Sequence, residues 1–509
     1  MYISTLNTRT LSTEDRLEEL RQALTNLKWD IIGLSEVRRM GDEIREYEDF
    51  IFYYHGEKKG MYGVGFIIKK KYRQHIEEFR GISDRIAILD IKLPGIKKPI
   101  SLIQIYAPTE ETIEEEKEKF YQTLHETMEK THKQKIIIGD FNSKVGTRQE
   151  GEELILGCYS SGNRNNNGQR LVNFALEYNL KIMNSFYKKH NKRKWTWISP
   201  DGKYKNEIDF VITNMSQHLS NVEVINQLNF STNHRMVRAT FNTKNTTRSR
   251  RHFKTGDAKY TTVKISEEMV VKLKESLPEM SLIKTMQEKY DILEKHILDV
   301  GKKLSIEKSK KDRVGDEARE LMEKRRELIL DRKTNIKEIE DISKKITTSI
   351  RKHQQLTRIE TIRKEIEKTG GIKKALKQLK EHKIWMPSIQ RRDNVPTSNR
   401  SKISKTATDF YKDLYSIDNC ETFDIPPSTT KEEEIVPSIL TSETRKAIMS
   451  QKNFKAPGED KITNELLKQL IDVIDEPLTA LFNEILYTEQ IPTQWTNSTI
   501  VLILTTIDQ

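Results

Sequence analysis

The stretch at residues 135–142, KIIIGDFN, constrains the fold more than any other part of this 509-residue chain. Three consecutive β-branched isoleucines favour a strand that is covered on both faces. Gly139 then permits a sharp turn of the backbone. Asp140 and Asn142 follow close together, where they either hold a water molecule and a phosphate oxygen or cap a turn. The choice between these two interpretations depends on what the rest of the chain supplies.

The sequence around this stretch predicts one α/β domain over residues 1–243. Short apolar runs with the character of strands alternate there with a smaller number of helical patterns. The predicted strands are 2–6, 30–34, 64–68, 86–93, 99–106, 181–184, 195–198, 208–213 and 236–241, and the predicted helices are 17–27, 114–130 and 171–178. Many strands and few helices indicate two packed sheets with helices outside.

The remaining sequence divides by composition into four further parts. Residues 244–262 are polar and basic and predict a linker, and residues 391–440 predict a second, loop-rich linker. In residues 263–390, isoleucines at helical spacing lie among Lys, Arg and Glu, which predicts long helices or a helical hairpin rather than a compact core. Residues 441–509 predict three helices, at 442–451, 463–474 and 478–487, before a strand-like run at 500–504.

The basic charge of the chain is concentrated in one segment. The formal net charge is +12, and residues 301–400 hold 29 Lys and Arg against 16 Asp and Glu, so the other 409 residues sum to −1. Such a segment favours nucleic acid as a partner. The alternative is a solvated helix that is merely rich in lysine.

Targeting signals and cysteines bear on the compartment. The sequence contains no run of about 18 apolar residues, and its N-terminus lacks a basic flank with an apolar core, so we expect neither a membrane partner nor secretion. Cys158 and Cys420 lie far apart in the sequence, which favours a reducing compartment. We therefore expect a nuclear or cytoplasmic protein.

Several polar side chains follow the predicted strands directly, where a sheet-based fold assembles its sites. They are Asn7, Glu36, Tyr106, Asp140, Asn142, Asp209 and His234. Mg²⁺ takes one or two carboxylates and completes its shell with water, which suits Glu36. Asp140 is suited to orient or deprotonate a water, and His234 to bind a phosphoryl oxygen with Asp209 behind it. Taken singly, Glu36 also fits a surface residue, His234 a structural histidine and Tyr106 a packing aromatic.

Taken together and in this order, these residues resemble the motifs of the endonuclease/exonuclease/phosphatase superfamily. The motifs are Asn7, 35–38 (SEVR), 63–65 (GVG), 105–108 (IYAP), 139–142 (GDFN), 208–210 (IDF) and 233–234 (NH). The resemblance is greatest to the apurinic-like endonuclease domain of non-LTR (LINE-type) retrotransposons and covers nearly all of residues 1–243. It implies an α/β four-layer sandwich of the DNase I-like type and DNA nicking that depends on Mg²⁺, with Mn²⁺ as a substitute.

The resemblance also implies a role for each matched residue. It implies metal contacts for Glu36, Asn7 and Asn233, catalytic roles for Asp140, Asn142, His234, Asp209 and Tyr106, and substrate binding by Arg38, Arg85, Thr109 and Trp197. The family usually has Ser-Asp-His where this chain has Thr232-Asn233-His234. The lost carboxylate predicts weaker metal binding or an altered pH dependence.

The C-terminal part carries a second resemblance. Residues 455–462 (KAPGEDKI), with Pro492 and Trp495, are similar to the opening fingers segment of a LINE-type reverse transcriptase. The palm and a paired-aspartate motif do not follow, so we expect no polymerase activity. The resemblance implies a retrotransposon parent that nicks target DNA and primes reverse transcription, with template RNA as a further partner. An abasic-site repair endonuclease and a degenerate, non-catalytic nucleic-acid-binding protein remain as alternatives.

Overall fold

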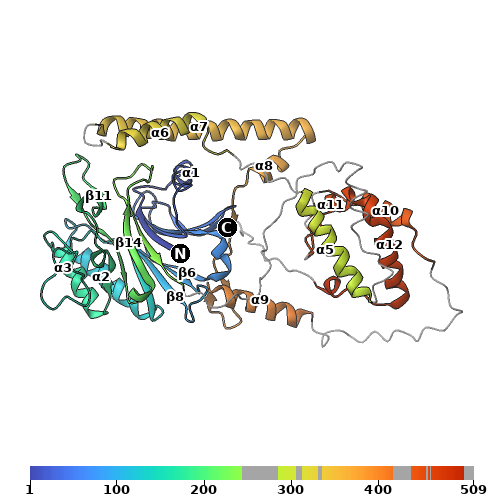
Figure 1. Cartoon of the computed structure of the whole chain (residues 1–509), viewed down its shortest axis with the longest axis horizontal. Helices are drawn as coiled ribbons and strands as arrows, with labels where there is room; N and C mark the ends of the chain where they lie inside the picture. The colour runs from blue at the N-terminus through green and yellow to red at the C-terminus, as the bar shows by residue number, and fades with distance from the viewer. Residues whose placement is uncertain are drawn as a thin grey trace. The chain divides into compact units, whose positions relative to one another are not determined.

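The computed structural model describes most of the chain as two compact units (Figure 1). The described residues are 1–243, 285–304, 312–330, 335–415 and 437–497 without 454, 456 and 459. The described parts of 1–248 and 312–419 form one unit, and those of 249–311 and 420–507 form the other. The linker predicted at 244–262, the start of the segment 263–390 and the strand-like run 500–504 lie outside the described residues.

The first unit contains an eight-stranded mixed sheet. In order across the sheet its strands are β14 (Leu219–Ile225), β15 (Met236–Phe241), β1 (Tyr2–Asn7), β2 (Ile31–Ser35), β5 (Val64–Lys69), β4 (Phe50–Gly56), β3 (Gly41–Glu46) and β16 (Lys383–Ile384). β1 and β2 run parallel, and the register ends with Asn7 beside Ser35. The two parallel carboxyl ends therefore meet at one edge of the sheet.

A six-stranded mixed sheet packs against the first. Its order is β10 (Lys181–Ile182), β13 (Asp209–Thr213), β9 (Gln134–Asp140), β8 (Ile100–Tyr106), β7 (Ile86–Ile91) and β6 (Ile76–Ser83). β8 and β9 are parallel and end with Tyr106 beside Asp140, while β13 runs antiparallel and begins with Asp209 beside the same Asp140. β9 is the strand that the isoleucine run predicted.

The isoleucines of β9 separate two apolar layers. Ile136 and Ile138 pack between the sheets, whereas Ile137 packs outward beneath α2 (Glu114–Glu129) and α3 (Asn166–Glu177). α1 (Glu14–Ala23) covers the outer face of the first sheet. The alternation of side chains along a strand thus places β9 in both cores. The result is the predicted sandwich of helix, sheet, sheet and helix.

Some predicted elements differ in the structure. β3, β4, β6 and β14 follow no prediction. β3, β6 and β14 mix charged residues with apolar ones, whereas β4 is an apolar and aromatic run that the sequence analysis missed. The run predicted as a strand at 195–198 contributes only the short β11 (Trp197–Ile198), which pairs with β12 (Lys205–Asn206) and joins neither large sheet. The part of 391–440 that was predicted as loop contains the helix α9 (Arg400–Leu414).

The segment after the sandwich packs onto it within the same unit. α6 (Asp316–Leu330) and α7 (Ile336–Thr369) lie side by side and form a helical hairpin with its own small apolar core (Figure 1). α8 (Lys373–Leu379) follows Gly370, whose φ of 69° ends α7. The expectation that this segment has no compact core is therefore wrong for α6 and α7, because the apolar faces of the two helices cover each other.

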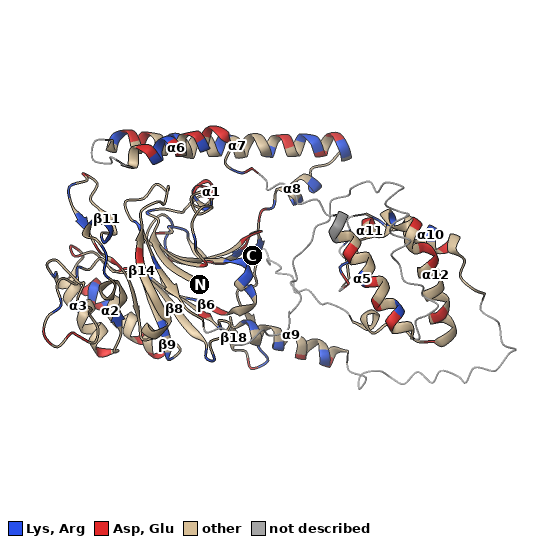
Figure 2. Ribbon diagram, viewed as in Figure 1, with Lys and Arg blue, Asp and Glu red and all other residues tan. Residues whose placement is uncertain are grey.

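Charge along the hairpin is mixed (Figure 2). Acidic and basic side chains alternate on α6 and the first half of α7. Residues 351–380, the second half of α7 and α8, hold 10 Lys and Arg against 3 Asp and Glu. The basic character predicted for 301–400 is therefore concentrated in this shorter stretch among the described residues.

The second unit is helical. α5 (Met286–Leu304) shares an apolar cluster with α11 (Asn464–Gln469) and α12 (Ile471–Thr488), and α10 (Thr441–Ser450) packs on α12. The two helices predicted at 463–474 and 478–487 are divided differently, because α12 continues through Pro477. Within the described parts of the chain, no helix combines the length and the apolar character needed to cross a bilayer.

Candidate active site

The polar residues predicted from strand ends meet at one edge of the sandwich. β1, β2, β8 and β9 all finish there, and β13 and β15 begin there. The parallel pairs bring Asn7 and Ser35 from one sheet opposite Tyr106 and Asp140 from the other. Because each residue belongs to or directly follows a buried strand, the backbone beneath the group is rigid.

Asp140, Asp209 and His234 form a buried triad at this edge. The Oδ2 atom of Asp209 lies 3.0 Å from Nδ1 of His234, and the Nε2 atom of His234 lies 3.7 Å from Oδ2 of Asp140. Burial lowers the pKa of His234, but the charges of Asp209 and Asp140 outweigh burial and raise that pKa to about 9. Burial and the charge of Asp209 raise the pKa of Asp140 to about 7, against the opposing effect of His234. The imidazole therefore carries its positive charge at neutral pH.

Two threonines to which the sequence analysis assigned no role hold this triad. The hydroxyl of Thr196 accepts the backbone N–H of Ile208 at 3.0 Å and that of Asp209 at 3.1 Å. The hydroxyl of Thr232 accepts the N–H of His234 at 3.2 Å and donates to the carbonyl of Asn7 at 2.8 Å. The position of Thr232 two residues before the histidine is a known turn signal, whereas the role of Thr196 has no signal in the sequence.

Asn7 joins the triad to Glu36. Its Nδ2 donates to Oε1 of Glu36 and to Oδ2 of Asp140, each at 2.9 Å, while its Oδ1 accepts the backbone N–H of Arg9 at 2.8 Å. Glu36 has a φ of 53° and also accepts Arg38 at 2.6 Å. The oxygen of Asn7 is therefore occupied, and its amide holds two carboxylates together.

Tyr106 and Arg85 line the same edge. The Arg85 guanidinium carbon lies 5.3 Å from the centroid of the Tyr106 ring and 4.0 Å from that of Tyr62. Nη1 of Arg85 donates to the Tyr106 carbonyl at 3.3 Å. Burial, followed by the charges of Glu36 and Asp140, raises the pKa of Tyr106 well above its ordinary value. The phenol is consequently a neutral hydrogen-bond donor at any physiological pH.

Asn142 is fixed beside Asp140. With a φ of 46°, it donates its backbone N–H to Asp140 Oδ1 at 3.0 Å and its side-chain amide to the carbonyl of Ala107 at 2.8 Å. Trp197 forms an antiparallel backbone bridge with His234. Thr109 is exposed, and its hydroxyl contacts Thr112 at 3.0 Å. Thr109 is thus one of the twelve predicted residues, but its hydroxyl bonds Thr112 and not a residue of the triad.

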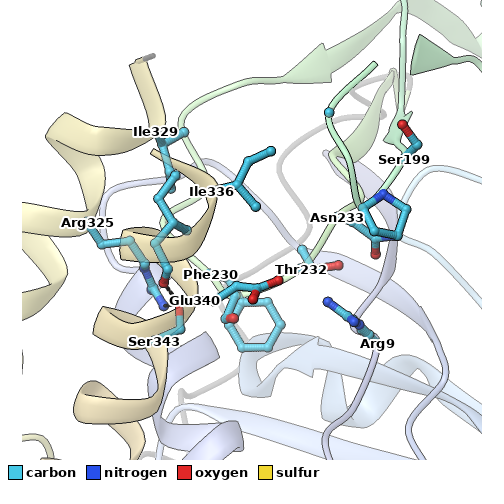
Figure 3. A pocket seen from close by; sticks show the side chains of 14 residues that line it. Arg9, Ser199, Phe230, Thr232, Asn233, Arg325, Ile329, Ile336, Glu340 and Ser343 are labelled. Atoms are coloured by element: carbon cyan, nitrogen blue, oxygen red, sulfur yellow. Dashed lines mark hydrogen bonds between the residues drawn. The ribbon is translucent and has the colours of Figure 1, made fainter. Parts of the chain in front are cut away.

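Asn233 directly precedes His234 in the sequence. It lines a hollow with Arg9 and Ser199 on one side and residues of α6 and α7, such as Glu340, on the other (Figure 3). Its backbone carbonyl accepts the N–H of Ile198 at 3.1 Å.

The donor atoms at this edge suit a hard divalent cation. Asp140, Asp209 and His234 each offer a ligand-type atom within 4.8 Å of the others. The imidazole Nδ1 is engaged by Asp209, however, and Oδ1 of Asp209 is buried with no hydrogen-bond partner among the described residues. The Glu36 side chain is held by the amide of Asn7 and by Arg38, and at 15% exposed it is more accessible than Asp140 or Asp209. Glu36 and Asp140 fit the oxygen preference of Mg²⁺.

Comparisons with known proteins agree with the class that the motifs predicted. Residues 100–238 match a family model described as endonuclease-reverse transcriptase. This region holds eight of the twelve predicted residues, including the whole triad, and the resemblance to the endonuclease/exonuclease/phosphatase superfamily is confirmed.

Two curated relatives and one solved structure align with less than half of this chain. Craniofacial development protein 2 of Bos taurus is 32% identical over 213 residues, which are 41% of this chain and 35% of that protein. Craniofacial development protein 2 of Tragulus javanicus is 30% identical over 41% of this chain and 36% of that protein. The chain thus matches about a third of the length of these curated relatives. Among solved structures, the endonuclease domain of TRAS1, a telomere-specific non-LTR retrotransposon, aligns at 13% identity with a TM-score of 0.35, over 48% of this chain and 99% of that domain.

Proposed function

We propose that this chain is an endonuclease that depends on a divalent metal, Mg²⁺ or Mn²⁺, and nicks DNA. The observation that carries the proposal is the buried triad, which keeps a charged imidazole beside a carboxylate, next to the clamped Glu36. A histidine of this kind suits a developing negative charge on a phosphoryl group. A cation held by Glu36 would supply further stabilisation of that charge.

Each residue of the site then has a distinct task. Asp140 orients the attacking water and accepts its proton, which suits a carboxylate whose pKa burial has raised to about 7. His234 donates from Nε2 to a non-bridging phosphoryl oxygen, while Asp209 keeps the imidazole charged and oriented. Tyr106 and Asn142 donate hydrogen bonds to the phosphate, and Asn7 holds Glu36 beside Asp140.

The reaction is hydrolysis of one phosphodiester bond. The oxygen of water bonds to phosphorus, and the bond between phosphorus and O3′ breaks. The water loses one proton to Asp140, and the leaving O3′ takes one proton from solvent. The products are a 3′-hydroxyl and a 5′-phosphate, so charge and atoms balance.

Basic side chains around the site are suited to the DNA backbone. Arg38 and Arg85 lie at the site itself, with Trp197 beside the histidine. Thr109 is exposed close in sequence to Tyr106 and would contact the strand outside the reacting phosphate. The stretch 351–380 adds phosphate contacts that carry no sequence information.

We further propose that the chain derives from a retrotransposon protein. In this account residues 1–243 are the endonuclease, 263–390 the connector between the linkers 244–262 and 391–440, and 441–509 the start of a reverse transcriptase. The 3′-hydroxyl left by nicking would prime reverse transcription of template RNA by the parent protein. The family description endonuclease-reverse transcriptase supports this reading.

One observation favours a second candidate, a nucleic-acid-binding protein without activity. Asn233 stands where the family usually has an aspartate, and it lines a hollow beside Arg9 and Thr232. Loss of that charge would leave binding through 351–380 as the remaining function.

A labelled duplex oligonucleotide separates these candidates. The full chain is incubated with intact duplex and with duplex containing an abasic-site analogue, with Mg²⁺, Mn²⁺ or EDTA. The proposal expects metal-dependent cleavage of intact duplex to 3′-hydroxyl ends. Cleavage confined to the abasic substrate would indicate a repair endonuclease. Binding without cleavage, with activity restored in Asn233→Asp, would indicate the decayed enzyme.

A further inference from the structure

We propose that the helical hairpin, α6 and α7, is a positioning element of the active site, and that Arg325 is the residue through which it acts. The inference rests on the proposed function for its catalytic consequence. Its structural part, that the hairpin orders the loop at residues 229–234 before β15, stands on the contacts alone.

Arg325 is a fully buried arginine at the contact between α6 and the sandwich. Its side chain is 0% exposed, as is that of its ion-pair partner Glu19 on α1, and the Nη1–Oε1 distance is 2.8 Å. Its Nε donates to Oδ1 of Asn229 at 3.0 Å, and its Nη2 donates to the carbonyl of Asn229 at 2.8 Å. The planar guanidinium therefore grips α1 and the loop at the same time.

Further hydrogen bonds hold the same loop to α6 and α1. Asn229 donates its amide to the carbonyl of Met322 on α6 at 2.6 Å. Ser231 donates its N–H to Oε1 of Glu19 at 3.3 Å and accepts Arg16 on its carbonyl at 2.9 Å. Glu19 is also paired with Arg16. Arg325 and Ser231 thus share one carboxylate oxygen.

This network reaches the triad within three residues. Thr232 directly follows Ser231, and its hydroxyl holds the N–H of His234 and the carbonyl of Asn7. A shift of the loop would move both the imidazole and the asparagine that clamps Glu36 and Asp140. The hairpin is therefore linked to two parts of the site through the loop and the Thr232 hydroxyl.

The sandwich depends on the hairpin in return. α1 buries three carboxylates on the face that meets the connector, namely Asp15, Glu18 and Glu19. Arg351 pairs with Asp15 at 3.2 Å, Arg313 with Glu18 at 3.2 Å, and Arg325 with Glu19. Each connector arginine thus faces one acid of α1. Glu18 and Glu19 also pair with Arg21 and Arg16 of α1, so the connector arginines add a second cation to each and supply the ion-pair partner of Asp15. Burial of three carboxylates is unfavourable without enough cationic partners, which favours a covered face.

The same contact forms a hollow beside the site (Figure 3). Ile329, Ile336 and Glu340 of the hairpin stand on one side, with Arg9 and Asn233 on the other. Arg9 donates its N–H to Asn7, so this wall is continuous with the clamp. The hairpin is accordingly a structural part of the surroundings of the active site, although it lies outside the matched residues 100–238.

The test uses the full chain and two variants with matched controls. Arg325→Met removes the grip on α1 and the loop, and Arg326→Met changes the next arginine, whose side chain is 61% exposed. Asn229→Ala removes the loop side of the contact and leaves the buried ion pair intact, and Asn226→Ala changes an exposed asparagine of the same loop. Asn229→Ala keeps the test valid if Arg325→Met fails to fold.

Hydrogen exchange and nicking kinetics are measured on these four variants and on Arg325→Lys. We expect exchange at residues 229–235 to rise at least about tenfold in Asn229→Ala and Arg325→Met. We expect kcat to fall by about 10-fold to 100-fold, with KM changed less than about threefold, because the site is displaced while DNA contacts persist. Arg325→Lys should show lower kcat and faster exchange than the unmodified chain, because an ammonium group cannot donate to Glu19 and Asn229 with the planar geometry of a guanidinium. The controls should match the unmodified chain.

Unchanged exchange at 229–235 in both variants would overturn the positioning role. Faster exchange with unchanged kcat would overturn its catalytic consequence. If the unmodified chain does not nick DNA at all, the proposed function fails, and the exchange experiment still decides whether the hairpin orders the loop.

Discussion

The buried triad makes Asp209→Asn the most informative substitution in this chain. The side chain is 0% exposed, and its Oδ2 lies 3.0 Å from Nδ1 of His234. Asparagine has nearly the same shape and can still present an oxygen to the imidazole. The substitution removes the negative charge that contributes most to raising the pKa of His234. The change therefore tests the charge of the triad and leaves its packing in place.

The magnitude follows from the geometry. Coulomb's law with an effective dielectric constant of about 20 gives about 5 kcal/mol for unit charges at this separation. Part of this energy remains, because the neutral oxygen still accepts a hydrogen bond. We therefore expect a loss of about 3 to 5 kcal/mol of transition-state stabilisation, which is a fall in kcat of about 10²-fold to 10⁴-fold.

Single-turnover nicking at saturating protein measures this loss. Asp90→Asn is the matched control, because Asp90 is also a buried carboxylate, paired with Arg80 at 2.7 Å, at the opposite end of the same sheet. That control should lose stability without a comparable loss in kcat. Activity of Asp209→Asn within about threefold of the unmodified chain, with the fold intact by circular dichroism, would refute the role given to the charge.

Three further predictions concern the strand, the metal and the DNA. In Gly139→Ala, the added methyl group would lie 2.1 Å from the carbonyl oxygen of Ile105, and residue 139 has a φ of 152°. We therefore expect the free energy of unfolding, measured by urea denaturation, to fall by about 2 to 4 kcal/mol. Unchanged stability would contradict this geometry. Glu36→Gln should raise the Mg²⁺ concentration for half-maximal nicking by at least about tenfold, and an unchanged metal titration would remove Glu36 from the metal site. Replacing the four lysines of residues 373–380 with glutamine should reduce the slope of log K against log salt by about 3, whereas an unchanged slope would make α8 a solvated helix.

The position of the site was predictable because strands are rigid and their ends are few. The isoleucine run at 136–138 is a strong strand signal, and β9 carries Asp140 at its end. The pairing of β9 with its neighbours then places the polar residues at the ends of those strands beside Asp140, as with Tyr106 and Asp209. Short-range signals were therefore sufficient to select the residues that lie together.

The contacts that hold the site could not be read in the same way. Asn7 lies 29 positions from Glu36 and 133 positions from Asp140 in the sequence, yet it bonds both. Arg325 and Glu19, which form an ion pair, are 306 positions apart. The acidic face of α1 reads as solvated in the sequence, because Glu and Asp are usually exposed. The structure explains why this face is buried, because arginines of the connector form ion pairs with its carboxylates. Long-range pairing of charges has no local pattern to reveal it.

The central claim is tested most directly by plasmid nicking. The full chain and its Asp140→Ala variant are incubated with supercoiled plasmid, with Mg²⁺, Mn²⁺ or EDTA, and open circles are counted over time. The account predicts that open circles form with the unmodified chain and a divalent metal, and that both EDTA and Asp140→Ala abolish them. Absence of nicking by the folded chain under every metal condition, or equal nicking by Asp140→Ala, would contradict it.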